Sequence, residues 1–576
     1  MNQIYYHFSA VILIFLLNFG EQAMGQRDST KLNQNVEVVK PYRPSISNVQ
    51  KMNLLPVIDD TTRSTPEFNY SIESYPFSTR FNAYPIGAAE IKNQTYKNNG
   101  IGYLKLGAGI INTTYGDFFL NTTESKNWTF GLRLKHLASQ GNAKLTKGDI
   151  SDASYSNNKA EVFGSCLLGS STLSSGLSYS RDMVRFYGYP DTIPRVLYSQ
   201  NLYAPYFGSK QIFQKTQFNI NLKSNGEEKS IFNYNSGFRF HYFDAKTGQQ
   251  ENSMGLFADF DYKFDKFKGL IESSFDHFTT SGILTSPGMD KNDSWLKLSP
   301  SLLFTGENWS LKGGVSFYSV SDNQGESTAK MYPKIDLTFI PVKDVLTLYA
   351  GIDGYLQNCN YSEIAYENNW INPMHNVINV DHRYILFGGL KGKINQQISY
   401  NFSAKYSDVK DLHFYILKSA NTAPPYIYNN AFDVLYDNTG IFNLSMEFSY
   451  VLSKDYSFKL KANYYNYTLE NLGFAPLLPD FDLFGTAGYR INDRLTGFTD
   501  LIVTGQRKGL FQAADETKTV YELNPILNIN LGAEYELKHN LKIFGRIENL
   551  LNQHYEQLPG YNSLGLRLMA GASISF

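Results

Sequence analysis

The sequence is poor in cysteine and in charge. Its two cysteines, Cys166 and Cys359, lie far apart and outside any CxxC pattern, so we expect neither a disulfide framework nor a zinc site. Charged residues make up 18% of the chain, below the roughly 25% that is usual for soluble proteins. The 52 basic and 53 acidic residues balance, which gives no electrostatic reason to expect a nucleic-acid partner.

Long apolar runs and enzyme motifs are also missing. Beyond the N-terminus no stretch of 18 apolar residues occurs, so we expect no transmembrane helix. The HExxH, GxSxG and P-loop signatures are absent, and we predict no enzymatic activity. The best metal candidate is Asp381-His382 with His375 in or beside one loop. Such exposed histidines are more often surface residues than ligands, so we predict no metal site and no cofactor.

One apolar block stands at the N-terminus, from Phe8 to Leu17, and the small residues Ala23-Met24-Gly25 precede Gln26. This order predicts a secretory signal peptide over residues 1–25, although its first residues include no Lys or Arg. The alternative is an uncleaved anchor, but the block is shorter than the ~20 residues that a spanning helix needs.

Aromatic residues are abundant, at 15%, and apolar and polar residues alternate after residue 100. At the C-terminus one face of a predicted strand holds Leu564, Leu566, Leu568, Ala570, Ala572 and Ile574 before the final Phe576. Many such segments are longer than the 5 to 6 residues typical of soluble strands and reach the about 9 to 11 that a transmembrane strand needs. We therefore expect the apolar faces to contact lipid.

The connections between these segments alternate between short and long. Short breaks such as 169–170 and 265–266 alternate with long polar stretches such as 244–253 and 408–439. This asymmetry is typical of outer-membrane barrels with short periplasmic turns. We predict an all-β fold, a transmembrane antiparallel barrel of about 22 strands over residues 101–576. Its lumen is too wide for its own side chains to fill, and the proline-rich, extended segment 26–100 is the only candidate we find to fill it.

The C-terminus resembles that of TonB-dependent outer-membrane receptors of the Bacteroidota type. The similarity lies in a segment that leads through an external loop into the last strand, and its matching residues are Asn549, Leu550, Leu551, Asn552 and Tyr555. The stretches KPYRPSISNVQK, YLKLGAGIINTTYGDFFLN and WTFGLRLKHLASQG look like a plug-poor subgroup of these barrels. The resemblance implies that the last strand, residues 564–576 with the terminal Phe576, is the signal that the outer-membrane barrel assembly machinery reads.

The chain departs from that family because segment 26–100 is too short for a full plug domain. Val36-Glu37-Val38-Val39 is similar to the box that binds TonB, or else is ordinary valine-rich strand sequence. Two functions stay open. The first is receptor-like transport of an unidentified solute across the outer membrane of a Gram-negative cell, either TonB-linked or as a passive pore. The second is a structural platform for a lipoprotein or a periplasmic partner.

Overall fold

The computed structural model describes residues 101–576, except for 123–126, 146–147, 149, 189–197, 200–209, 227–229, 283–290, 322–325, 373–376, 419–427, 454 and 514. The predicted signal peptide, segment 26–100 and the residues Val36, Glu37, Val38 and Val39 lie outside the described residues. In the described part of the chain, no helix has the length and hydropathy needed to cross a membrane.

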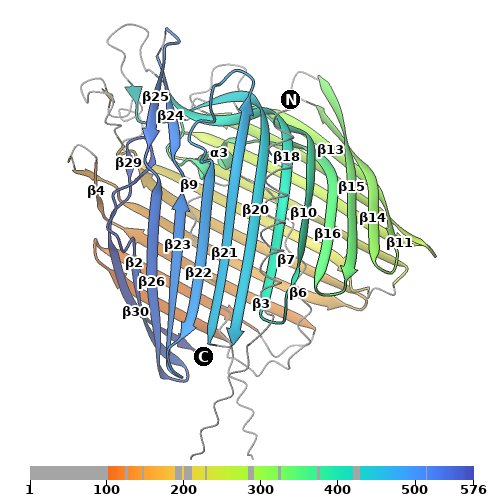
Figure 1. Ribbon diagram of the computed structural model, residues 1–576, viewed down its shortest axis with the longest axis horizontal. Helices are drawn as coiled ribbons and strands as arrows, with labels where there is room; N and C mark the ends of the chain where they lie inside the picture. The colour runs from red at the N-terminus through yellow and green to blue at the C-terminus, as the bar shows by residue number, and fades with distance from the viewer. Residues whose placement is uncertain are drawn as a thin grey trace, which may run out of the picture. The chain divides into compact units, whose positions relative to one another are not determined.

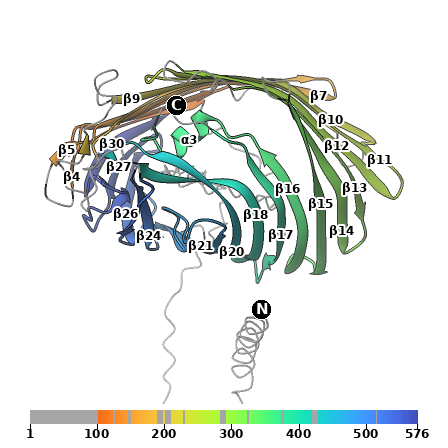
Figure 2. The ribbon, with the colours of Figure 1, turned by 90° about the horizontal axis from the view of Figure 1, so that it is seen from above.

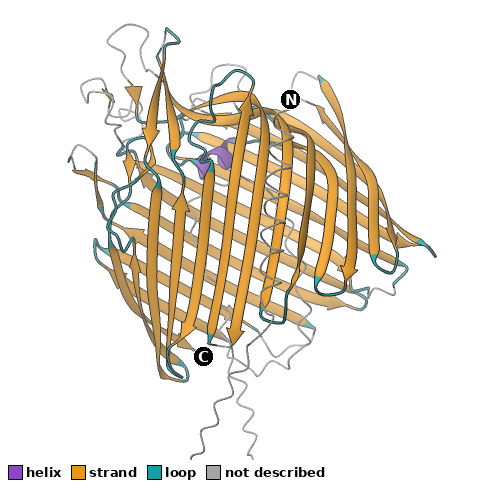
Figure 3. Ribbon diagram, in the orientation of Figure 1, coloured by secondary structure: helices purple, strands orange, loops and turns teal. Residues whose placement is uncertain are grey.

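The described residues form a closed antiparallel barrel built almost entirely of strands (Figures 1 and 3). Each strand pairs with the next one in the barrel, and the first pairs with the last. The barrel strands are β1 (Gly102–Gly109), β2 (Thr113–Asn121), β3 (Trp128–Ser139), β6 (Tyr155–Leu168), β7 (Ser171–Arg185), β9 (Lys210–Ser224), β10 (Phe232–Ala245), β11 (Gln249–Lys263), β12 (Phe267–Gly282), β13 (Asn292–Thr305), β14 (Trp309–Ser321), β15 (Ser327–Val342), β16 (Leu346–Gln357), β17 (Val380–Lys393), β18 (Ile398–Lys418), β20 (Asp433–Ser453), β21 (Tyr456–Leu469), β22 (Phe481–Arg490), β23 (Leu495–Thr504), β26 (Ile526–Lys538), β27 (Leu541–Glu548) and β30 (Arg567–Ser575). The prediction of about 22 antiparallel strands is confirmed.

Alternation of side chains places an apolar face on the outside of the barrel. In β11, Leu256, Phe260 and Tyr262 are exposed, whereas Asp259 and Asp261 on the opposite face accept hydrogen bonds from asparagine side chains of β10. In β30, Leu568, Ala570, Ala572 and Ile574 are exposed in the same way. Large exposed apolar residues on every second position are expected where a sheet faces lipid rather than water.

The last strand is shorter than the sequence pattern suggested. The alternation predicted a strand over residues 564–576, but β30 begins at Arg567. Gly565 has a φ of +74°, a conformation that a strand cannot continue through. Leu564 packs against buried residues of the loops, so the prediction that it shares the outer face of Leu568 is wrong, and Leu566 likewise precedes the strand.

The two ends of the barrel differ as the sequence indicated, although several loops are smaller than predicted. One end, the turn end, carries short turns such as 169–170 between β6 and β7. At the other, the loop end, β10 continues to Ala245 and β11 starts at Gln249, so the predicted loop over 244–253 is mostly strand. Strands β18 and β20 are each 21 residues long, and both extend into the predicted loop over 408–439. The polar residues in these extensions form backbone hydrogen bonds across a hairpin. Because polar residues occur both in loops and in such hairpins, polarity alone does not predict where the strands end.

The loop-end connections pack into a hydrophobic core of their own, which we call the roof. It includes the helix α3 (Tyr361–Glu367) and the hairpin of β24 (Arg507–Gln512) and β25 (Lys518–Leu523), whose strand β24 pairs with the end of β18. Seen from above, α3 lies inside the ring of strands (Figure 2). Short pairs complete the loop end: β4 (Asn142–Lys144) with β5 (Ile150–Asp152), β8 (Tyr198–Ser199) with β19 (Tyr428–Asn429), and β28 (Glu556–Leu558) with β29 (Tyr561–Asn562). Segment 26–100 is therefore not the only part of the chain suited to fill the barrel mouth.

Candidate functional site

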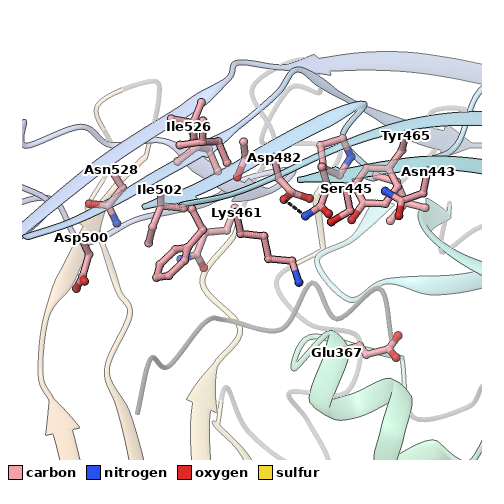
Figure 4. A pocket seen from close by; sticks show the side chains of 18 of the residues that line it. Glu367, Asn443, Ser445, Lys461, Tyr465, Asp482, Asp500, Ile502, Ile526 and Asn528 are labelled. Atoms are coloured by element: carbon pink, nitrogen blue, oxygen red, sulfur yellow. Dashed lines mark hydrogen bonds between the residues drawn. The ribbon is translucent and has the colours of Figure 1, made fainter. Parts of the chain in front are cut away.

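A cavity of about 1430 Å³ lies in the lumen of the barrel. Figure 4 shows one of its walls, where polar side chains extend from adjacent strands, with Glu367 on α3 opposite them. We call this wall the amide wall, and it consists of Asn443 and Ser445 of β20, Asn463 of β21, Asp482 of β22, Asp500 of β23, and Asn528 and Asn530 of β26. The volume exceeds the roughly 300–1,000 Å³ of common small-molecule pockets, so the cavity has room for a solute of several rings.

Hydrogen bonds hold several side chains of the amide wall in place. Asn463 Nδ2 donates to Asp482 Oδ1 at 2.7 Å, and Asn443 Nδ2 donates to the carbonyl of Tyr464 at 3.2 Å. Asn528 Nδ2 donates to the hydroxyl of Tyr555 at 3.3 Å. Such bonds restrict the rotation of Asn443, Asn463 and Asn528, and a fixed wall is better suited to recognise a solute than a mobile one.

Several charged side chains that line the cavity form ion pairs between strands. Lys461 Nζ lies 2.9 Å from Glu447, and Lys105 Nζ lies 2.7 Å from Glu534. All four of these side chains line the cavity.

A second charged group crosses four consecutive strands, β12 to β15. The carboxylate of Glu272 receives Lys334 at 2.8 Å and both Lys297 and Lys312 at 3.5 Å. Asp336 stands directly opposite Lys312 on the neighbouring strand, and Asp353 lines the same part of the cavity. Three ammonium groups therefore share the carboxylate of Glu272.

Two carboxylates, that of the buried Glu251 and that of the partly exposed Glu367, attach α3 to the barrel wall. Glu251 of β11, which is 4% exposed, accepts hydrogen bonds from the backbone N–H groups of Tyr361 and Ser362 at the start of the helix. At the other end, Glu367 accepts from His413 Nε2 at 2.7 Å and from the Tyr415 hydroxyl at 2.8 Å. The helix is thus anchored at both of its termini to strands far from it in the sequence.

The anchoring groups lie on the loop side of the exposed apolar band and have shifted pKa values. Burial raises the pKa of Glu251 to about 7, and its hydrogen bonds from Tyr361 and Ser362 only partly oppose this. Burial would lower the pKa of His413, but its contacts with Cys359 and Glu367 outweigh that and raise it to about 10. Sequence reasoning missed these residues, because Glu251 fell in a predicted loop and nothing local linked it to α3.

Aromatic rings fill the roof above the cavity. Trp370 stacks on Tyr561 with ring centroids 4.0 Å apart, and Tyr187 meets Tyr561 edge-on at 5.0 Å. The Trp370 indole N–H donates to the carbonyl of Arg185 at 2.8 Å. The polar edge of the Trp370 indole is therefore satisfied, and the three rings form the base of the roof.

The sequence-based metal candidate is occupied by other interactions. The Asp381 carboxylate accepts a hydrogen bond from Tyr332 at 2.7 Å, and His382 Nε2 lies 3.2 Å from Gln357 Oε1. His375 lies outside the described residues. Within the described ranges, no group of three His, Cys, Asp or Glu side chains is placed to hold a metal ion.

The C-terminal motif forms a tight turn after β27. Asn549 and Asn552 both have positive φ, of 52° and 50°, which asparagine tolerates better than most residues. Asn549 Oδ1 accepts from the N–H of Gln553 at 3.0 Å, and Asn552 Oδ1 accepts from the N–H of Leu566 at 2.9 Å. Between them, Leu550 and Leu551 are exposed, and Tyr555 lines the cavity. The motif thus shapes the entry to the last strand.

Phe576 closes the seam between β1 and β30. Its carbonyl accepts from the N–H groups of Ile101 at 2.6 Å and Gly102 at 3.0 Å, and its own N–H donates to Gly102. The residue is 46% exposed, and its ring stacks on the ring of Phe118 with centroids 6.4 Å apart. The expected pairing of the last strand with residues near 102–111 is confirmed, from Tyr103 opposite Ser575 to Gly109 opposite Met569.

Small residues keep this seam closely packed. Gly107 of β1 and Gly571 of β30 face each other, and the ring of Phe544 on β27 covers both. A Cβ added to Gly571 would collide with that ring and with the carbonyl of Leu106. Aromatic side chains that cover glycine on a neighbouring strand are a known way to stabilise curved sheets.

No protein-family model matches the chain, and no curated protein matches it. Solved structures do resemble it. The iron transporter FrpB from Neisseria meningitidis (F3-3 variant) matches with a TM-score of 0.62 and 9% identity, over 83% of this chain and 82% of that one. The pyoverdine outer membrane receptor FpvA from Pseudomonas aeruginosa PAO1 matches with a TM-score of 0.61 and 12% identity, over 84% and 80%. The copper transporter OprC matches with a TM-score of 0.59 and 12% identity, over 82% and 80%. The chain therefore has the barrel fold of outer-membrane receptors and transporters.

Proposed function

We propose that this chain is an outer-membrane barrel that takes part in the transport of a solute, as a receptor-like rather than a catalytic protein. The observation that carries the proposal is the cavity of about 1430 Å³ inside a closed 22-strand barrel, beneath a packed roof. A barrel built only as a platform has no need of such a chamber with ordered polar walls. The solved structures with the same fold are described as transporters and receptors, which supports this reading.

The location in the outer membrane is part of the proposal. It is supported by the exposed apolar face of strands such as β11 and β30 and by the contrast between the turn end and the loop end. We propose that the turn end of the barrel faces the periplasm and that the roof faces the outside of the cell. Lipids then cover the outer face, and the barrel assembly machinery would recognise the last strand through Leu568, Ala570, Ala572, Ile574 and Phe576.

The source of energy is a further part of the proposal. We propose that Val36-Glu37-Val38-Val39 binds TonB by adding a strand, and that segment 26–100 restricts flow through the lumen. Strand addition requires backbone N–H donors. Val38→Pro removes one of them and fixes φ, so we expect this change to abolish uptake while the barrel still folds and binds its solute.

Reconstitution in planar bilayers tests the proposal. We expect the full-length chain to conduct little and the chain without residues 26–100 to give a large, steady conductance. Free conductance by the full-length chain would instead indicate a passive pore. The structural platform for a lipoprotein or a periplasmic partner would be favoured by a different result. In that case the full-length barrel is closed in bilayers, and cells that lack the protein, or that carry Val38→Pro, show no defect in uptake.

A further inference from the structure

The charged residues that line the cavity are unevenly distributed around the barrel. Among the described residues, strands β12 to β18 contribute five lysines and three carboxylates, an excess of two positive charges (5 − 3). The rest of the cavity lining contributes six basic and six acidic residues, which balance. We call the five lysines the lysine wall, and they are Lys297, Lys312, Lys334, Lys391 and Lys405.

The carboxylate of Glu272 neutralises only part of the lysine wall. Three of the five lysines share it, at 2.8 to 3.5 Å. Lys391 Nζ instead faces the ring of Tyr349, whose centroid is 5.6 Å away. An aromatic ring attracts an ammonium group less strongly than a carboxylate does. The wall is therefore suited to a partner that carries negative charge.

Segment 26–100 contains such a partner. Residues 59–73, which we call the acidic stretch, carry a net charge of −3 (1 − 4), from the single basic residue Arg63 and from Asp59, Asp60, Glu67 and Glu73. Residues 26–58 carry a net charge of +3 (5 − 2), and residues 74–100 carry +2 (3 − 1). Of these three parts of the segment, only the acidic stretch has a charge that complements the lysine wall.

The acidic stretch is near enough in the sequence to reach the lysine wall. Ile101 lies at the turn end, where its N–H donates to the carbonyl of Phe576 at the seam of β1 and β30. Strands β14 and β15 lie across the ring from β30 (Figure 2). The 28 positions from Glu73 to Ile101 (101 − 73) can span roughly 30 Å as a flexible coil and up to about 90 Å when extended. The chain is therefore long enough to cross the lumen.

We propose, building on the restriction of flow by segment 26–100 proposed above, that the acidic stretch binds the lysine wall and that this contact closes the lumen. The three net negative charges of the stretch offset the two net positive charges of the wall. The attraction depends on salt, because the Debye length falls from about 10 Å at 0.1 M to about 3 Å at 1 M. Closure by this contact is therefore tighter at low ionic strength.

Conductance of the full-length protein in planar bilayers at 0.1 M salt tests the contact. The first variant combines Asp59→Asn, Asp60→Asn, Glu67→Gln and Glu73→Gln, which remove four negative charges and preserve the shapes of the side chains. We expect it to conduct at least tenfold more than the wild type. Because the loss of charge opens the lumen, 1 M salt should raise the conductance of the wild type by more than the conductivity of the solution alone explains.

The reciprocal change is made in the wall. Lys391→Glu should open the lumen, and the addition of Asp59→Lys and Asp60→Lys to this variant should close it again. Lys393→Glu is the matched control, since Lys393 lies on the same face of β17, nearer the turn end, and is not among the described residues that line the cavity. We expect this control to conduct as little as the wild type. Heat-modifiable gel mobility verifies that each barrel is folded.

A chemical cross-link tests the contact directly in the purified protein. A carbodiimide couples a carboxylate to an amine only where the two groups touch, and mass spectrometry of the digested protein identifies the coupled residues. We expect Lys391 or Lys312 to be coupled to the acidic stretch at 0.1 M salt and much less at 1 M salt. Coupling of Lys334 to Glu272, 2.8 Å apart, is the internal standard.

The outcomes separate this inference from the proposed function. If deletion of residues 26–100 opens the barrel but the variant without the four carboxylates stays closed and forms no such cross-link, the inference is wrong and restriction by the segment stands. Equal conductance of Lys391→Glu and Lys393→Glu would likewise overturn the assignment to the lysine wall. If deletion of residues 26–100 leaves the conductance unchanged, the proposed restriction of flow is itself wrong.

Discussion

The attachment of α3 to Glu251 predicts that the roof loosens as the pH rises. Glu251 is buried, and its pKa is raised from 4.5 to about 7 when the roof is closed. The closed form therefore holds the proton more tightly than an open form in which the carboxyl is solvated. By linkage, the stability of the closed roof is greatest below about pH 4.5, falls between pH 4.5 and 7, and changes little above pH 7 from this group.

The size of the effect follows from the shift. A difference of about 2.5 pH units corresponds to roughly 3 kcal/mol at 1.36 kcal/mol per unit. No large reduction for solvent screening applies, because only 4% of Glu251 is exposed. Glu251→Gln keeps the shape and an acceptor oxygen but cannot ionise, so this variant should lack the pH dependence between 4.5 and 7. Glu251→Gln also loses one acceptor oxygen for the N–H groups of α3. The free energy of that loss does not depend on pH, so it cancels when the same variant is compared at two pH values.

Hydrogen exchange of the backbone amides of α3, corrected for intrinsic rates, measures the opening free energy at pH 5 and pH 8. From pH 5 to pH 8 we expect the wild type to lose roughly 2.5 kcal/mol more opening free energy than Glu251→Gln. Glu307→Gln, at an exposed turn-end residue, is the control and should behave as the wild type does. If the wild type and Glu251→Gln change in parallel with pH, the reasoning about Glu251 is refuted.

Other predictions concern the seam and the lipid face. Gly571→Ala should destabilise the barrel by about 1–3 kcal/mol through overpacking against Phe544, whereas Gly545→Ala, where an added Cβ meets no atom within 4 Å, should be almost neutral in urea unfolding. Leu568→Arg should cost roughly 2–4 kcal/mol if the residue lies at mid-membrane and should lower the amount of folded barrel, whereas Ser573→Asn on the lumen side should be nearly silent; equal effects would mean that the faces are assigned wrongly. Deletion of Phe576 should reduce assembly, as judged by heat-modifiable mobility in outer-membrane fractions, and unchanged levels would contradict its role in closing the seam.

The barrel could be predicted from the sequence because the patterns that specify it lie within single strands and the turns that join them. Alternation with a period of two assigns each side chain of a strand such as β11 to one face, and short turns recur at one end. The strand number follows from these two patterns. Strand ends were less predictable, since residues such as Asp244 and Gln250 are polar in a loop and equally polar in a hairpin that extends beyond the membrane.

The roof and the cavity could not be predicted, because they depend on contacts between residues far apart in the sequence. Glu251 and the amide of Ser362 are separated by 111 positions, and Lys105 and Glu534 by 429. Neither pair leaves a periodic signal. Leu564 shows the same limit, since its alternation with Leu566 and Leu568 is consistent with a strand until the positive φ of Gly565 is known.

The pairing of β1 with β30 has a consequence for the order of events during biogenesis. The backbone groups on one edge of β1 find their partners only in the final strand, so that edge stays open until the rest of the barrel has formed. An open strand edge is a template for pairing with any other extended chain, and pairings between distant segments form slowly. The nascent barrel must therefore be shielded along β1 throughout its passage to the membrane, and ring closure becomes the step that ends its dependence on other proteins.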